Sequence, residues 1–319
     1  LPQNRESPTE VPSSLLQAKM SPNTRRAYVA DWTLFARWCH DMGLTALPAT
    51  PETVANYFEF IGSTGELKLA SIRRKKASIS AAHRLEGHEP PPTNNREVRA
   101  VIKDISKELE TPRRRARALL PKHVLEWLPK LPDNLLRVRD RAILTLGLSG
   151  GFRRKELAFI ELRDLRFVDN GMVVLIRKPE NDSERISRRV FVPTNPEPML
   201  DPVDAVLEWL REAQLEAHID NRGRLFRSLK GITIFYDLSI WGETVNRTVK
   251  RLVKAGGAVD PALFSGHSLR IGYIVSSISA GEDPQEVLQN TGISDLRTLT
   301  QYIPRKSVVI ENNQICVGF

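Results

Sequence analysis

Residues 144–165 read LTLGLSGGFRRKELAFIELRDL. An apolar helix is expected to end at the pair Gly150-Gly151, and a polar helix is expected to begin soon after it with the cations Arg153-Arg154-Lys155. The glycines allow a ligand to approach the backbone closely, and the start of the second helix offers free amides and the positive end of a helix dipole. This stretch is therefore a candidate anion site.

The sequence on either side of this stretch predicts a mostly helical domain with one small antiparallel sheet. The expected strands cover residues 165–168, 172–176 and 189–192, and the Asn170-Gly171 step between the first two is a strong hairpin signal. The expected helices are 121–128, 136–148, 202–217, 240–255, 268–280, 284–289 and 296–302.

A bundle of four helices is expected before this domain. Ser21-Pro22 and Thr50-Pro51 each place a capping side chain before a proline, which is a signal for the start of a helix. The helices are expected within 21–43, 50–61, 69–85 and 94–109. The domain boundaries that follow are a flexible arm over 1–20, the bundle over 21–111, a basic linker over 112–118 and the second domain over 119–319.

The composition excludes several classes of protein. With 41% hydrophobic and 27% charged residues the chain is able to bury a core, so it is not disordered throughout. The two cysteines, Cys39 and Cys316, are too few for a disulfide scaffold or a cysteine-rich zinc site, and they suit a reducing cytoplasm. No apolar run approaches the ~18 residues of a membrane span. Residues 1–19 lack the pattern of a signal peptide.

The positive charge of the chain is concentrated in one segment. The net charge is +9, and residues 68–117 hold 14 Lys and Arg against 6 Asp and Glu. This concentration favours a polyanion as partner, although a solvated helix face and an ordinary exposed linker remain alternatives. The candidate binding residues are Arg73, Arg74, Lys75 and Lys76 in the bundle and Arg113, Arg114, Arg115 and Arg117 in the linker.

Four further polar positions of the second domain are poorly explained by packing alone. His267 and Arg270 are three residues apart, so they share one face of a helix. Lys178 follows the strand over 172–176, and Tyr302 lies near the end of a helix with a polar face. Taken singly, the histidine could be a satisfied core residue and the tyrosine a packing residue.

In chain order, an arginine, a lysine on a hairpin, His-x-x-Arg and a tyrosine form the pattern of the tyrosine recombinases, the phage-integrase family. Residues 144–165 resemble their first arginine box. Residues 263–303, LFSGHSLRIGYIVSSISAGEDPQEVLQNTGISDLRTLTQYI, resemble their second box and nucleophile helix. The resemblance covers residues 119–302 and is greatest to the Cre-type branch. It implies a mainly α fold: an N-terminal, SAM-like, core-binding bundle and a mixed α/β catalytic domain with a small antiparallel sheet.

The resemblance also implies a role for each residue of the pattern. The nucleophile would be Tyr302, the catalytic arginines Arg153 and Arg270, the acidic support Glu156, the hairpin lysine Lys178 and the first histidine His267. One position departs from the pattern, because Ile293 stands where the family has His or, in Cre, Trp, and isoleucine has no hydrogen-bond donor.

The chemistry implied is strand cleavage through a 3′-phosphotyrosine, which needs no ATP, metal or other cofactor. Two guanidiniums would stabilise the charge on the nonbridging oxygens, and Lys178 would give a proton to the leaving 5′ oxygen. The implied partners are double-stranded DNA sites, bound by a dimer on one site and a homotetramer on two duplexes. The implied location is the cytoplasm of a prokaryote or a host of a mobile element, in association with DNA.

Two other functions stay open at this level. Ile293 favours a relative that binds DNA without transferring strands. A type IB topoisomerase uses a similar set of residues but relaxes DNA without pairing sites. Tyr273 would be the first alternative nucleophile, although its place three residues after Arg270 on the same expected helix favours a packing role.

Overall fold

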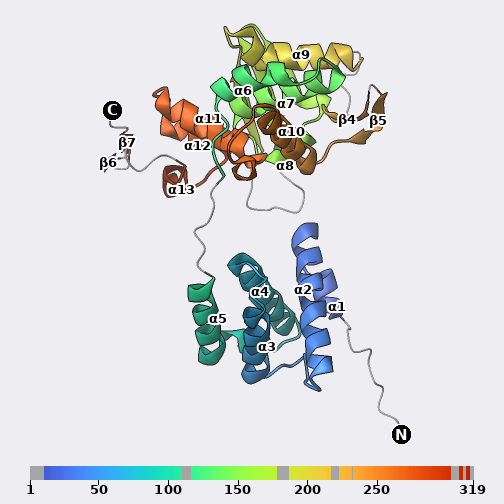
Figure 1. Cartoon of the computed structure of the whole chain (residues 1–319), viewed down its shortest axis with the longest axis vertical. Coiled ribbons are helices and arrows are strands. Elements are labelled where there is room, and N and C mark those ends of the chain that lie inside the picture. Colours follow the sequence, from blue (N-terminus) through green and yellow to red (C-terminus); the bar gives the residue numbers. More distant parts are fainter. Residues whose placement is uncertain are drawn as a thin grey trace. The chain divides into compact units, whose positions relative to one another are not determined.

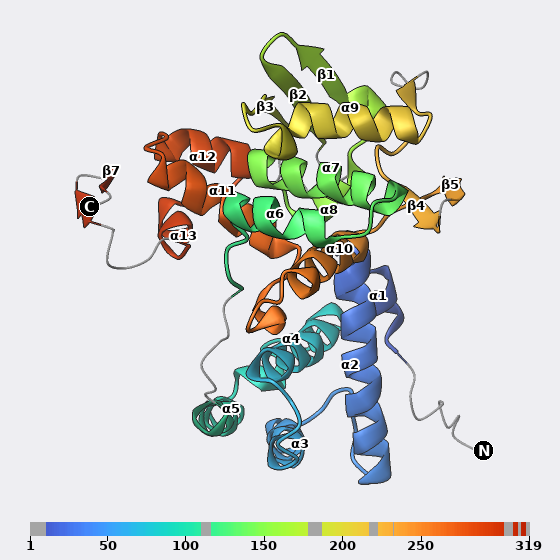
Figure 2. The same cartoon turned by 45° about the horizontal axis from the view of Figure 1, so that its top comes forward.

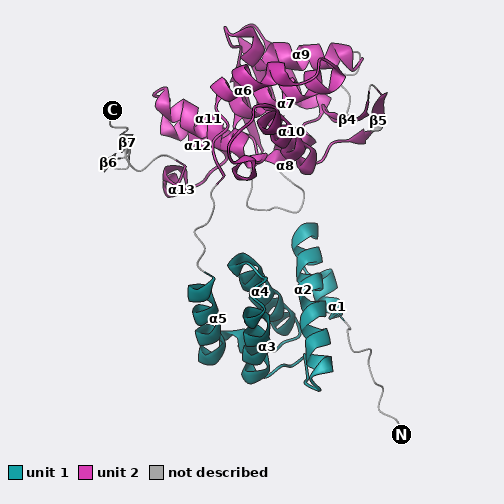
Figure 3. Cartoon of the chain, viewed as in Figure 1, with its two compact units in different colours: residues 1–113 teal, residues 114–319 magenta. Residues whose placement is uncertain are grey.

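The computed structural model describes residues 11–109, 116–177, 187–216, 223–231, 233–302, 309–311 and 314–316. The chain divides into two compact units, residues 1–113 and 114–319 (Figure 3), and each unit has a hydrophobic core of its own. Within the described ranges, no helix is long and apolar enough to cross a membrane. The predicted fold class, mainly helical with small antiparallel sheets, is confirmed.

Unit 1 is a bundle of helices (Figure 1), and two of them begin at the predicted capping signals. The Ser21 side chain accepts a hydrogen bond from the backbone of Thr24, and the Thr50 side chain accepts one from Thr53. A proline occupies the first turn of both helices. The α-helices of this unit are α1 (Ser13–Gln17), α2 (Pro22–Asp41), α3 (Pro51–Ser63), α4 (Leu69–Leu85) and α5 (Arg96–Glu108).

The core of unit 1 corrects the expectation of a loose arm over residues 1–20. Residues 13–17 form α1, and Leu15 on this helix is fully buried beside Trp32 and Phe35 in the core. Val11 and Met20, on either side of α1, also pack against this core. Burial of a leucine stabilises the fold by roughly 1.5–3 kcal/mol, which offsets part of the entropy cost of ordering α1.

The basic quartet of α4 does not point outward as a whole. Lys75 is only 4% exposed, and its Nζ lies 3.1 Å from Oδ1 of Asp31, a buried carboxylate on α2. Arg74 donates to both oxygens of the same carboxylate, from Nε at 2.7 Å and from Nη2 at 3.2 Å. Lys75 is therefore excluded as a free phosphate contact, because a buried carboxylate must be paired with cations.

Unit 2 contains α-helices with a small sheet and separate hairpins. Its helices are α6 (Pro121–Trp127), α7 (Leu135–Gly150), α8 (Arg154–Phe159), α9 (Pro202–Glu212), α10 (Gly242–Ala255), α11 (His267–Ser279), α12 (Pro284–Thr291) and α13 (Leu296–Thr300). Its strands are β1 (Leu165–Val168), β2 (Gly171–Ile176), β3 (Arg188–Pro193), β4 (Arg227–Lys230), β5 (Thr233–Ser239), β6 (Val309–Glu311) and β7 (Gln314–Cys316).

The three-stranded sheet has the order β1-β2-β3 and is antiparallel throughout. The predicted hairpin forms, but its turn is Asp169-Asn170, because Gly171 is already the first residue of β2 and pairs with Val168. Met172 pairs with Phe167 on one side and Val192 on the other. The β4–β5 hairpin lies in a stretch for which the sequence predicted no element. Helix α9 is shorter than predicted, because Gln214 adopts a φ of 54°, which ends the helical path.

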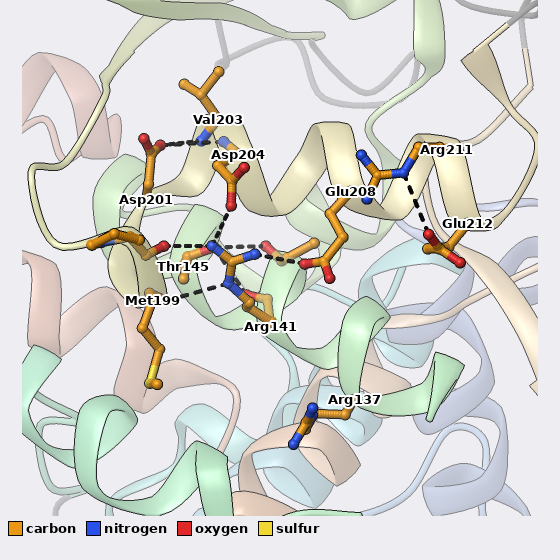
Figure 4. Close-up of polar contacts among 12 residues, drawn as sticks. Arg137, Arg141, Thr145, Met199, Asp201, Val203, Asp204, Glu208, Arg211 and Glu212 are labelled. Carbon is orange, nitrogen blue, oxygen red and sulfur yellow. Dashed lines mark hydrogen bonds and ion pairs between the residues drawn. The ribbon is translucent and has the colours of Figure 1, made fainter. Parts of the chain in front are cut away.

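Helix α7 is the central element of unit 2. It contacts α9 and β3, as well as α8, α10 and α11 (Figure 2). Its apolar side chains Ile143, Leu144 and Leu146 are fully buried. Arg141 ties it to α9 by donating to Asp204 and Glu208, with 2.6 Å for each of these two bonds (Figure 4). The C-terminal end of this well-packed helix is where the candidate anion site begins.

Candidate active site

The turn between α7 and α8 depends on a glycine. Gly151 has a φ of +60°, and a Cβ at this position would lie 2.4 Å from the ring of Tyr273. Other residues would be strained by this φ and would also clash with the ring. The turn makes Arg153 the N-terminal capping residue of α8, so its side chain leaves the helix at the candidate anion site.

Glu156 is the centre of the hydrogen-bond network. Its Oε2 accepts from the backbone N–H of Arg153 at 2.8 Å, in the manner of a capping box, and its Oε1 accepts from Arg153 Nη1 at 2.8 Å. Arg188 donates to both oxygens as well, from Nη1 at 3.1 Å and from Nη2 at 2.8 Å. Burial alone would raise the pKa of Glu156, but the bonds from Arg188 and Arg153 outweigh it and lower this pKa to about 2. Glu156 is therefore ionised at neutral pH.

Arg188 is the site residue that the sequence analysis missed. The expected strand began at residue 189, whereas β3 begins at Arg188. Arg188 shares the inward face of this strand with the buried Val190 and Val192, because alternate residues of a strand face the same side. A cation at the start of an inward-facing row was the signal that could have revealed it.

Arg270 is 3% exposed, although it carries a charge. Its Nη1 donates to the carbonyl oxygens of Gly151 at 2.9 Å and Thr291 at 2.6 Å. Burial is the largest effect on its pKa, and burial together with the nearby cations Arg153 and Arg188 lowers it to about 10. Arg270 therefore stays charged at neutral pH, and the cost of burying it is partly offset by the two carbonyl bonds and by Glu156.

The end of α12 collects three arginines. The carbonyl of Asn290 accepts from Arg188 Nε at 2.9 Å and the carbonyl of Gly292 accepts from Arg153 Nη2 at 3.0 Å. The carbonyl between them accepts from Arg270. Carbonyls at the end of a helix lack partners within the helix and carry partial negative charge, so they suit guanidiniums. Gly292 permits this turn, since its φ is +60°.

His267 and Tyr302 lie beside each other at the same site. The centres of their rings are 5.8 Å apart in an edge-to-face arrangement. Burial, followed by Arg270, Arg153 and Arg154, lowers the pKa of His267 below its usual value of 6.5, so this ring is neutral at pH 7. Tyr302 itself lies in a turn after α13, which ends at Thr300 rather than at the predicted residue 302.

Ile293 is partly buried and packs, together with Leu296 and Tyr302, against an apolar cluster that includes Tyr273. Tyr273 is 7% exposed, and its hydroxyl accepts a hydrogen bond from Asn290 Nδ2 at 3.0 Å. The structure thus places Tyr273 in the packing of α11 against α12, whereas Tyr302 is half-exposed next to the cations.

The site has more cations than carboxylates. Among the described residues, Arg153, Arg188 and Arg270 surround one carboxylate, that of Glu156, which leaves an excess of positive charge. Within the described part of the chain, Nε of Arg153 and both Nε and Nη2 of Arg270 donate to no protein acceptor. These donors suit an anion with at least two oxygens. Among the same residues, no group of three His, Cys, Asp or Glu is placed to hold a metal ion.

Some candidate residues cannot be placed. Lys178, Arg113, Arg114 and Arg115 lie outside the described residues. Arg117 is described, and its backbone N–H donates to the carbonyl of Leu263 at 2.9 Å. The candidate residues that the structure does bring together are Arg153, Glu156, His267, Arg270 and Tyr302, with Ile293 beside them.

The fold and this cluster define a class of protein, and residues 118–307 match the phage integrase family. Because the match spans more than half of the chain, the chain belongs to this family. The predicted enzyme class, a site-specific DNA recombinase of the tyrosine type, is confirmed.

Two curated relatives agree with this assignment. The chain is 29% identical to an integrase/recombinase XerD homologue from Selenomonas ruminantium over 304 residues, which are 93% of this chain and 86% of that protein. It is 22% identical to the recombinase Cre of Escherichia phage P1 over 289 residues, 84% of this chain and 80% of Cre. Because the XerD homologue is the stronger match, the predicted placement in the Cre-type branch receives only weak support.

The solved structures contain the same fold. The site-specific recombinase XerH, crystallised on a palindromic difH substrate after cleavage, aligns with a TM-score of 0.61 at 16% sequence identity. The alignment covers 87% of this chain and 75% of XerH. At this identity the likeness shows the arrangement of elements, and the roles of individual residues have to be argued from their own geometry.

Proposed function

We propose that this recombinase cleaves duplex DNA with Tyr302 as the nucleophile. The phenolic oxygen attacks the phosphorus of the scissile phosphodiester, a bond from phosphorus to tyrosine forms, and the bond to the 5′ oxygen breaks. A 5′ hydroxyl from another strand reverses the step and joins the strands. The observation that carries this proposal is the excess of guanidinium groups beside Tyr302, with donors left for an anion.

The arginines act on the charge of the transition state. Cleavage places negative charge on the nonbridging oxygens, and planar guanidiniums are suited to bind two oxygens at once. Arg153 and Arg270 are held by protein carbonyls and by Glu156 before the substrate arrives. Because these donors are already oriented, they need little reorganisation during the reaction. They therefore stabilise the transition state more than the enzyme–substrate complex that precedes it.

Cleavage needs one group that accepts the phenolic proton and another that donates a proton to the leaving oxygen. His267 is neutral at pH 7 and lies beside Tyr302, so we assign it the phenolic proton. The leaving 5′ oxygen needs a proton, and Lys178 is assigned this role from the family pattern alone. Ile293 takes no part in proton transfer, because its side chain has neither donor nor acceptor.

The test is the formation of a covalent adduct. The full chain is incubated with a library of random duplexes, and protein-bound DNA is recovered after denaturing electrophoresis and sequenced. We expect an adduct with a defined sequence, carried on the peptide that contains Tyr302. Tyr302→Phe should bind the recovered DNA but form no adduct, whereas Tyr273→Phe, the matched control, should still form it.

The alternatives give different results in this experiment. A protein that binds DNA without strand transfer forms no adduct under any condition. A type IB topoisomerase relaxes supercoiled plasmid without preference for the recovered sequence. An adduct on Tyr273, or one that persists in Tyr302→Phe, would show that the nucleophile is assigned wrongly.

Duplex DNA is the proposed partner of both units. Unit 1, the predicted core-binding domain, presents Arg73 on the exposed face of α4. Arg74 is half-exposed while it pairs with Asp31, and Lys76 is partly buried. We infer that Arg73, Arg74 and Lys76 contact phosphates and that Lys75 only supports them. The XerH and XerD-like relatives support the choice of DNA as polyanion.

The proposed assembly is a dimer on one site and a tetramer when two sites pair. The segment after Tyr302 contains the short hairpin β6–β7, which pairs Val309 with Cys316. Such a segment is too small for a core of its own, and we propose that it binds a neighbouring subunit. Deletion of residues 307–319 should leave half-site binding intact and abolish cooperative occupancy in native gels. Tetramers formed by the shortened chain would contradict this proposal.

A further inference from the structure

Arg188 reaches the site from β3, outside both sequence boxes. Its side chain is 16% exposed and uses all three of its nitrogens on protein acceptors. Two of them bind the two oxygens of Glu156, and the third binds the carbonyl of Asn290. A guanidinium whose three nitrogens all donate to protein acceptors is a poor candidate for direct contact with a substrate. Its role is therefore to be found in the groups that it binds.

The first thing it holds is Glu156. The same carboxylate accepts two bonds from Arg153, so Glu156 lies between two arginines that approach it from α8 and from β3. Bidentate pairing fixes the plane of the carboxylate as well as its position. The orientation of Arg153 is therefore set in part by Arg188, although no bond joins these two residues directly.

The second thing it holds is the end of α12. The Arg188 bond to the carbonyl of Asn290 is adjacent to the carbonyls that bind Arg270 and Arg153. Its Nη1 would lie 3.2 Å from a Cβ added at Gly292, so the guanidinium also fills the space left by this glycine. Arg188 thus connects the sheet to the segment that leads into Ile293 and α13.

We propose that Arg188 is a positioning residue for strand cleavage: it holds Glu156 and the end of α12 so that Arg153 and Arg270 present their remaining donors to the scissile phosphate. This inference rests on the function proposed above. It requires the forked shape of arginine, because a lysine supplies the charge but cannot bind both carboxylate oxygens and the carbonyl in one plane.

The dependence of cleavage on pH follows from the same contacts. The charged groups that face Glu156 are Arg153 on its own helix, Arg188 on β3 and Arg270 on α11. Without Arg188, burial is less compensated and the pKa of Glu156 rises. Protonation then occurs at higher pH, and a protonated carboxyl no longer accepts both bonds from Arg153. In a His267→Gln chain, where the acid-side loss caused by His267 is absent, the acid side of the rate profile should therefore move to higher pH.

The test compares Arg188→Gln and Arg188→Lys with Arg189→Gln, a matched control because Arg189 is the next residue of β3 and is exposed. Single-turnover adduct formation is measured over a range of pH on the DNA recovered with the unaltered chain. We expect Arg188→Gln to be slower by about 10–100-fold, a loss typical of misplaced catalytic groups. Arg188→Lys should recover little of the rate, and Arg188→Gln combined with His267→Gln should show the shifted acid limb.

A double-mutant cycle with Glu156→Gln separates positioning from general stability. If Arg188 acts through Glu156, the double variant should be no slower than the slower single variant. Should Arg188→Gln fail to fold, Arg188→Lys carries the same comparisons.

Equal rates for Arg188→Gln and Arg189→Gln, an acid limb that does not move, or additive effects in the cycle would overturn the inference alone. The absence of any adduct from the unaltered chain would overturn the proposed function and this inference with it.

Discussion

Two clusters in unit 2 use arginine for opposite purposes. Arg141 on α7 donates to Asp204 and Glu208 of α9 and to the carbonyls of Pro198 and Met199 (Figure 4). One cation therefore faces two carboxylates. At the candidate active site three guanidiniums share the single carboxylate of Glu156 and three carbonyls at the end of α12.

The difference shows that an excess of cations over negatively charged acceptors indicates an anion-binding site, whereas the presence of arginine alone does not. The acceptors around Arg141 outnumber its charge, so this cluster has no need of an external anion. The active-site cluster keeps excess positive charge and unused donors on partly and fully buried arginines, which is costly in a free protein. The proposed binding of a phosphodiester would relieve this cost.

The largest expected effect is a loss of cleavage rate when an arginine of the candidate active site is removed. Arg270→Ala should slow adduct formation by about 10²–10³-fold, as expected when one oriented donor to a developing negative charge is removed. Single-turnover cleavage of the recovered DNA site measures this rate. A folded Arg270→Ala chain that cleaves at the original rate would show that the charge excess has no role in the chemistry.

The next largest effect is expected on the free energy of unfolding, when Arg141 is removed from the other cluster. Arg141→Met removes the clamp between α7 and α9 and should lower the free energy of unfolding by about 1–3 kcal/mol. Urea unfolding measures this loss. The cleavage rate per folded molecule should not change, because Arg141 lies in the other cluster; a specific loss of cleavage would break the distinction between the two clusters.

His267 tests the electrostatic character of the active site. Its pKa is lowered from 6.5 by burial first and then by the surrounding arginines, so the neutral form is favoured at pH 7. Cleavage should be constant near neutral pH and fall only as the pH drops through this lowered pKa, where the ring gains a proton and no longer accepts one. His267→Gln should be slow and lack this step in its pH profile, and a step above pH 6.5 in the unaltered chain would contradict the assignment.

A smaller effect distinguishes the cations of α4. Arg73→Ala should reduce the slope of log K for DNA against log salt by up to ~0.9, the value for one lost phosphate contact. Lys75→Met should leave the slope unchanged and reduce stability instead, because Lys75 neutralises the buried Asp31. Binding titrations at several salt concentrations measure both slopes, and a reduced slope in Lys75→Met would return this lysine to the DNA interface.

The smallest effect is expected at Ile293. Ile293 is packed against the apolar cluster beside Tyr302, so the arginines and not this position carry the charge stabilisation. Ile293→His, which restores a donor found in the family, should cleave at the same rate or faster. Loss of cleavage in a folded Ile293→His chain would show that residue 293 does not correspond to the family position.

The sequence by itself determined the features that arise from neighbouring residues. Helices α2 and α3 begin where Ser21-Pro22 and Thr50-Pro51 place a cap before a proline, and the β1–β2 hairpin forms next to the Asn-Gly step, with its turn at residues 169–170. These signals act over a few residues, so they can be read without the fold. The two sequence boxes likewise led to Arg153 and Arg270, because each role is tied to a local motif.

Only the tertiary structure decided which charges meet. Arg188 binds Glu156 across 32 positions of the chain, and Lys75 binds Asp31 across 44. The alternation of β3 predicts that Arg188 faces inward once the start of the strand is known, but no local pattern names its partner. The partner of a buried charge depends on which distant elements pack together. Outside a single helix or a pair of strands, the two residues of an ion pair have no fixed separation in the sequence. For this reason the sequence alone identified the candidate catalytic residues, whereas only the fold placed Arg188 against Glu156.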